Sequence, residues 1–61
     1  MLNLSEVLLQ KQHELTSFVE LEKEIEHIAK TGDERFFRMD IKPPFADTPE
    51  NWEDRLEAAF Y

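Results

Sequence analysis

Residues 4–31 contain no glycine or proline, and their apolar side chains recur at the spacing of an α-helix. On a helix these side chains share an arc of roughly half the circumference. Asn3 and Glu6 match a capping box at the start of the segment, and Gly32 stands where a left-handed residue often ends a helix. The pattern therefore predicts one long amphipathic helix over about residues 4–31.

The length of this helix bears on assembly. A helix over residues 4–31 extends about 40 Å, whereas a compact globule formed by 61 residues has a diameter of roughly 27 Å. The rest of the chain cannot cover the whole apolar face, so we expect part of it to contact a second chain. A homodimer is the simplest assembly, because two-fold dimers are the commonest oligomers. The residues expected in this core and oligomer interface are Leu8, Leu15, Phe18, Leu21, Ile25 and Ile28.

Two charged residues, Lys11 and Glu14, interrupt the apolar face of the predicted helix. One explanation is that the lysine lays its aliphatic stem over neighbouring leucines and extends its ammonium group into water. The other is that Lys11 of one chain pairs with Glu14 of an antiparallel partner and fixes the register. The sequence leaves both explanations open.

A second, shorter helix is predicted over about residues 49–60. Thr48 is a favourable N-cap, and Pro49 suits the first helical position. Trp52 and Leu56 share an apolar edge, and we expect them to dock this helix on the long one, because so short a helix is marginal in water. The expected fold is therefore an all-α helical hairpin, a single small domain over residues 1–61 that self-associates into a helical bundle.

The segment between the two helices, residues 33–47, is open to two interpretations. Apolar and charged residues alternate from Phe37 to Ile41, as they do on a half-buried strand. A lone strand leaves its backbone groups unpaired, although pairing across a dimer would satisfy them. The interpretation that we favour is an irregular turn, or a short helix capped by Asp33.

The composition limits the classes of function. The chain has 14 acidic and 7 basic residues, a net charge of −7 and no cysteine. Such a surface repels nucleic acid and anionic membranes, so we expect no direct contact with either. Without cysteine no disulfide can form, which fits a cytoplasmic protein. No apolar run is longer than four residues, which is too short to span a bilayer, and no basic region marks a signal peptide.

One spacing is typical of a metal site: Glu24 and His27 are three residues apart, and Glu20 lies one turn earlier. Di-iron bundles use this spacing with the ligands directed into the bundle core. Here the residues lie outside the apolar arc, so we expect a solvated polar face with no metal and no cofactor. A single glycine cannot form a phosphate-binding loop, and no nucleophile stands in a motif with an acid and a base. The sequence therefore predicts that the protein is not an enzyme.

Aromatic residues gather in the C-terminal half of the chain. Phe36 and Phe37 are adjacent, so they cannot both point inward from one short element. If Phe37 is buried, Phe36 is left for a partner, and the same holds for the last residue, Tyr61. Exposed aromatic side chains rimmed by charge often mark protein-binding surfaces. The candidate partner contacts are Phe36, Phe45 and Tyr61, unless a dimer covers them.

In its size, acidity and plain helical pattern, the whole chain resembles short accessory or early proteins of temperate bacteriophages. This resemblance implies a protein that binds and modulates another protein, in the host cytoplasm if a phage encodes it. The first hypothesis is accordingly a small protein-interaction module. A remote alternative is a metal-binding bundle around Glu24 and His27. The other alternative is an acidic inhibitor that imitates nucleic acid, with a negative band formed by Glu20, Glu24, Asp54 and Glu57.

Overall fold

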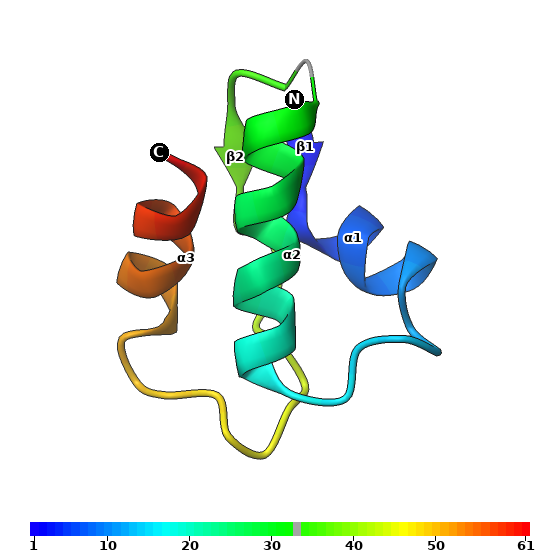
Figure 1. Ribbon diagram of the computed structural model, residues 1–61. Helices are drawn as coiled ribbons and strands as arrows, with labels where there is room; N and C mark the ends of the chain where they lie inside the picture. The colour runs from blue at the N-terminus through cyan, green and yellow to red at the C-terminus, as the bar shows by residue number, and fades with distance from the viewer. Residues whose placement is uncertain (33) are drawn as a thin grey trace.

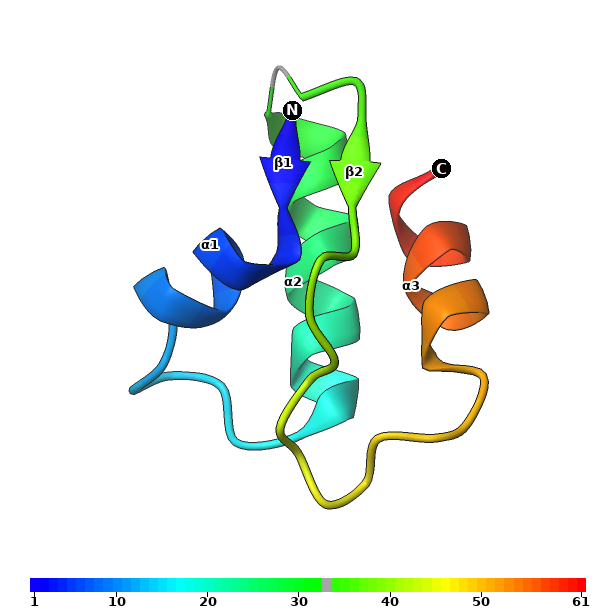
Figure 2. The same ribbon diagram turned by 180° about the vertical axis from the view of Figure 1, so that it is seen from behind.

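The computed structural model describes residues 1–32 and 34–61. Helix α2 lies at the centre, with the two strands against one side of it and α1 and α3 flanking it on opposite sides (Figure 1, Figure 2). Roughly half of the residues are helical. In chain order the elements are β1 (Leu2–Asn3), α1 (Leu4–Gln10), α2 (Phe18–Thr31), β2 (Phe37–Arg38) and α3 (Trp52–Phe60).

The predicted all-α hairpin is wrong, because the described residues form three helices and a two-stranded parallel sheet. The helix predicted over residues 4–31 is interrupted between α1 and α2. At the interruption Ser17 is extended, with φ −149° and ψ 163°, and its hydroxyl oxygen accepts a hydrogen bond from the N–H of Glu20 at 3.2 Å. The Glu20 carboxylate in turn accepts hydrogen bonds from the hydroxyl and the N–H of Thr16. These contacts begin a new helix inside a continuous apolar pattern.

Two aspartates from the segment before α3 cap the other helices from a distance. Asp47 accepts a hydrogen bond from the N–H of Phe18, the first residue of α2, at 2.8 Å. Asp40 accepts hydrogen bonds from the N–H and the hydroxyl of Ser5, in the first turn of α1, at 3.0 and 2.6 Å. The free N–H groups and the positive end of the dipole at a helix start favour such acidic acceptors. The segment from Asp40 to Asp47 is thereby attached to both helices.

The two strands join distant parts of one chain. Leu2 lies opposite Phe37 in the parallel register, and the N–H of Leu2 donates to the C=O of Phe36 at 2.8 Å. The strand interpretation of the middle segment is therefore confirmed at Phe37–Arg38, but its partner is the start of the same chain rather than a second copy. The favoured short helix does not form in residues 34–47. Its expected cap, Asp33, lies outside the described residues.

The core is one cluster built around α2. Phe18, Leu21 and Ile25 are fully buried there, against Leu4 of α1 and Leu56 of α3. The other residues expected in a core or oligomer interface lie half-buried at the edge of this cluster: Leu8, Leu15 and Ile28. The apolar face of the predicted long helix is thus divided over two helices that pack within one chain.

The helix lengths remove the geometric argument for a second chain. The longest helix among the described residues, α2, has 14 residues and spans about 21 Å. It fits within a molecule whose extents are 30 × 24 × 18 Å. Phe18 is covered by the chain's own C-terminal helix, since the guanidinium of Arg55 lies 5.1 Å from the centre of its ring. Self-association therefore needs an origin other than an overhanging helix.

Helix α3 packs on α2 through the expected side chains, with Leu56 fully buried and Trp52 half-buried. It begins at Trp52, later than the predicted start at Pro49. The hydroxyl of Thr48 donates to the C=O of Pro43 at 3.4 Å, and so it does not cap the helix. The Thr48-Pro49 pair therefore closes the preceding loop.

The residues at the start of α1 and at the end of α2 are the expected ones, but their hydrogen bonds and backbone angles differ from expectation. Asn3 is the N-cap of α1, but its amide nitrogen donates to the Glu6 carboxylate at 2.7 Å, and its side chain caps no backbone N–H. Gly32 ends α2 with φ −95° and ψ 175°, which is extended rather than left-handed. A β-carbon at this position would lie 2.9 Å from the carbonyl oxygen of Ile28. Glycine is therefore needed for close approach to the helix end.

Acid should weaken this fold through the carboxylates that cap it. The hydroxyl and N–H of Ser5 hold the pKa of Asp40 below its usual 3.8, and those of Thr16 hold the pKa of Glu20 below its usual 4.5. A group whose pKa is lower in the folded state contributes stability above its unfolded pKa and loses it as the pH falls through the folded pKa. We therefore expect the free energy of unfolding, measured by urea titration, to fall most steeply below about pH 4.

The Asp40→Asn variant is the control for this acid effect. It should be less stable than the wild type at neutral pH, because an amide oxygen is a weaker acceptor for Ser5 than a carboxylate. Its loss of stability in acid should be smaller, because one titrating cap is gone. Equal losses in the two proteins would contradict a role for Asp40 in acid unfolding.

Candidate protein-binding surface

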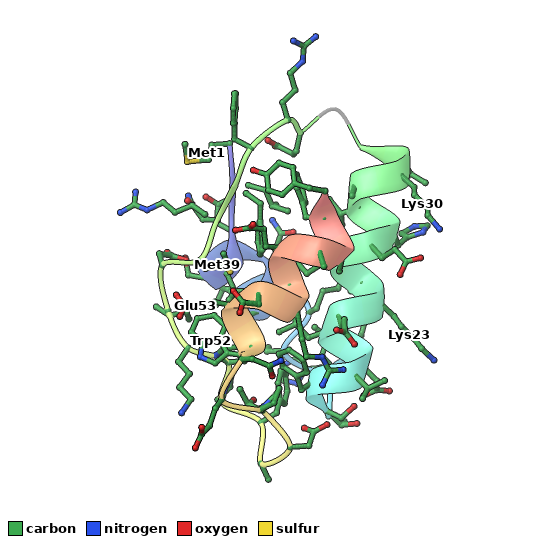
Figure 3. All side chains as sticks on the ribbon, turned by 90° about the vertical axis from the view of Figure 1, so that its left-hand side faces the viewer. Met1, Lys23, Lys30, Met39, Trp52 and Glu53 are labelled. Carbon is green, nitrogen blue, oxygen red and sulfur yellow. The ribbon has the colours of Figure 1, made fainter. Side chains whose placement is uncertain are left out.

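The outer side of the small sheet carries large exposed apolar side chains. Successive residues of a strand point to opposite sides, so the burial of Phe37 directs Phe36 outward, where it is 63% exposed. In the same register Met1 lies beside Phe36, and Met1 is 70% exposed. Figure 3 shows Met1 on the side of the molecule away from Lys23 and Lys30, which project from the outer face of α2.

Tyr61 extends this surface along the free edge of β2. Its hydroxyl accepts a hydrogen bond from the N–H of Phe37 at 3.2 Å. Its ring meets that of Phe60 edge to face at 4.8 Å, and Phe60 stacks on Phe37 at 5.2 Å. Aromatic pairs of this kind contribute about 0.5–1.5 kcal/mol beyond burial. Tyr61 is nevertheless 71% exposed, so it is held at its hydroxyl and open to solvent over most of its surface.

We call Met1, Phe36 and Tyr61 the sheet patch. Both chain ends lie at the end of the molecule where β2 begins (Figure 1, Figure 2). Exposed Arg35 and Arg38 adjoin the patch in sequence, and within residues 1–32 and 34–61 neither takes part in an ion pair. Methionine, aromatic residues and arginine are the types enriched at protein interfaces, whereas lysine and glutamate are depleted there.

The third predicted contact, Phe45, lies in a different environment. It is half-buried against the core, and its C=O accepts a hydrogen bond from the N–H of Thr48 at 3.1 Å. It therefore belongs to the loop before α3 rather than to the sheet patch. Met1 and the two arginines are the members of the surface that sequence reasoning missed.

The residues of the metal-like spacing are not brought together as a site. The carboxylate of Glu20 is occupied by hydrogen bonds from Thr16. Among the described residues, no three histidine, aspartate or glutamate side chains lie close enough to hold a metal ion. Glu24 is half-buried and His27 is exposed on α2.

A shallow depression of about 390 Å³ lies on the outer face of α2. Within it Lys30 pairs with Glu26 at 2.9 Å, and the hydrogen bond and charge of Lys30 lower the pKa of Glu26. The lysines at either end of this face point into solvent (Figure 3). The depression thus belongs to a charged, solvated helix face, and its lining residues are Lys23, Glu26, His27 and Lys30.

The predicted acidic band is divided between two sides of the molecule. The Glu22 carboxylate accepts two hydrogen bonds from Arg55, at 2.8 and 3.0 Å, which marks the side of α2 that faces α3. Glu20 and Glu24 lie two residues before and after Glu22, and at 3.6 residues per turn they point nearly the opposite way. They cannot form one continuous band with the acidic residues of α3.

Comparison with protein families, curated proteins and solved structures finds no match for this chain. In the described part of the chain, every helix is too short or too polar to cross a membrane. What the sheet patch can bind follows from its own side chains.

Proposed function

We propose that the protein is a small interaction module that binds and modulates another protein through the sheet patch. One observation carries this proposal: three large apolar side chains, 63% to 71% exposed, share one end of a small acidic molecule. Single exposed apolar residues are ordinary on protein surfaces, whereas a group rimmed by charge is typical of a binding site.

The chemistry of the patch indicates the kind of partner. Tyrosine and arginine are the residue types that most often dominate binding energy. Tyr61 is already held by the N–H of Phe37, so its ring loses little conformational freedom on binding. Exposed Arg35 and Arg38 place positive charge beside the patch on a chain with a net charge of −7. The complementary surface is an apolar depression with carboxylates at its rim.

Site-specific photocrosslinking tests this proposal in cells that express the protein. Benzoylphenylalanine at position 36 should yield a covalent adduct with a defined partner. The matched control is position 9 on α1, because Leu9 is similarly exposed, at 68%, but lies on a different element. Adducts of equal yield and identity from both positions would contradict a specific surface at the sheet.

A substitution pair then measures the contribution of Phe36 to affinity for the crosslinked partner. Phe36→Ser should weaken binding about tenfold or more, as expected for an anchor residue, and leave the thermal unfolding temperature nearly unchanged. Leu9→Ser should change neither quantity. Equal affinities of the two variants would overturn the assignment of the sheet patch.

A further inference from the structure

The linker between α1 and α2, residues 11–17, has a sequence that is compatible with a helix. It contains no glycine or proline, and no described residue has a positive φ. Lysine, glutamine, glutamate and leucine, all good helix formers, make up most of it. The apolar pattern of α1 continues through Leu15 into α2, so a straight helix would keep one apolar face.

The linker already holds part of a helix. The N–H of Lys11 donates to the C=O of Val7, and the N–H of Leu15 donates to the C=O of Lys11, both at 3.0 Å. Both bonds have the four-residue spacing of an α-helix. Lys11 also pairs with Glu14 of the same chain at 3.3 Å, which is helical spacing again. Helix α1 nevertheless ends at Gln10, with Lys11 at φ −109° and ψ 18°, so the linker is a turn that contains two bonds of helical spacing.

Side-chain hydrogen bonds hold the break open, and the one to the N–H of Phe18 is partly buried while the others lie at the surface. Ser17 accepts from the N–H of Glu20, Glu20 accepts from Thr16, and Asp47 accepts from the N–H of Phe18. If the linker became helical, the N–H groups of Phe18 and Glu20 would take carbonyl partners within the helix instead. The two arrangements thus exchange one set of hydrogen bonds for another.

Residues 1–10 are held by contacts that a second copy could supply equally well. They pair β1 with β2, bury Leu4 and Val7 in the core, and join Ser5 to Asp40. A continuous helix over residues 4–31 would be about 42 Å long and would carry residues 1–10 out of reach of their own sheet. Their vacated site fits the same residues of another molecule.

We propose that the chain forms a domain-swapped dimer, in which residues 11–17 become helical and residues 1–10 of each copy occupy their usual site on the other. Each half keeps the sheet, the core and all three helices, and only the linker changes. Exchange of an identical element is a low-cost route to a dimer. This inference does not depend on the proposed function, but each sheet patch would then combine Met1 of one copy with Phe36 and Tyr61 of the other.

A disulfide reports which copy supplies β1. The chain has no cysteine, and Asn3 lies opposite Arg38 in the ladder, where strands about 4.8 Å apart meet the Cα spacing of a disulfide. The N3C/R38C variant is equilibrated from micromolar to millimolar concentration, oxidised, and run on a non-reducing denaturing gel. We expect a covalent dimer whose fraction rises with concentration together with the dimer fraction in sedimentation. A covalent monomer at every concentration would overturn the proposal.

Two linker variants test whether the hinge controls the exchange. T16A/S17A removes the side chains that cap α2. These side chains stabilise only the monomer with the broken linker, and each dimer forms from two such monomers, so the dimer association constant should rise about tenfold or more. His13→Pro should lower it at least as much, because proline interrupts a helix and the N–H of His13 makes no backbone hydrogen bond among the described contacts of the linker. A dimer unaffected by His13→Pro would show association by another route and would overturn the swap.

Discussion

Replacing Phe18 with alanine should unfold most of the molecules at room temperature. Phe18 is fully buried at the start of α2, beneath the guanidinium of Arg55. Truncating a buried phenylalanine to alanine costs about 3–5 kcal/mol. The total stability of a domain of this size is only about 3–9 kcal/mol, so the loss is comparable with the whole. Far-ultraviolet circular dichroism should show a large loss of helix, and urea titration should show little or no folded baseline.

Phe36→Ala is the matched control for this result, because it makes the same chemical change at a side chain that is 63% exposed. A surface substitution of this kind changes stability by about 0.5 kcal/mol or less. The two variants should therefore differ by several kilocalories per mole. If they proved equally stable, Phe18 could not be the centre of the core.

Replacing Leu56 with alanine should detach α3 and with it the ring of Tyr61. Leu56 is fully buried on α2, and its truncation costs about 2–5 kcal/mol. A helix of 9 residues is not stable in water without such packing. Because Tyr61 follows this helix, its hydrogen bond to the N–H of Phe37 should be lost as well. Hydrogen exchange should then accelerate over Trp52–Phe60 and at Phe37.

The control for this experiment is Leu9→Ala, which removes the same atoms from a side chain that is 68% exposed on α1. Exchange over α3 should match the wild type in this variant. Protection of α3 that survived Leu56→Ala would mean that the helix is held by other contacts, such as the Glu22–Arg55 pair. The proposed link between α3 and the sheet patch would then fail.

The apolar spacing predicted which residues are buried better than it predicted where the helices begin and end. Phe18, Leu21 and Ile25 recur at helical intervals, and they are fully buried on α2. The break before them was missed because the same spacing continues across it. Ser17 and Glu20 do match a capping box, and this local signal was available. The second cap, Asp47, lies 29 residues from Phe18, and no local pattern connects the two.

The sheet was missed for a different reason. Strands of two residues are too short to show periodicity, and Leu2 pairs with a residue 35 positions away. Such pairing depends on how the two strands pack against α2, and not on the intrinsic strand preference of their residues. The adjacent pair Phe36 and Phe37 did predict that one ring points outward. Met1 could be added to that surface only once β1 was known to lie beside β2.

The central claim is that the N-terminal amphipathic segment breaks before Ser17 and folds back beside Phe37. Nuclear magnetic resonance on the monomer fraction tests this most directly, through backbone carbon shifts at residues 15–17 and cross-strand proton contacts of Leu2. We expect non-helical shifts at Thr16 and Ser17 together with contacts between Leu2 and Phe37. Unbroken helical shifts over residues 4–31, with no contact between Leu2 and Phe37, would contradict it.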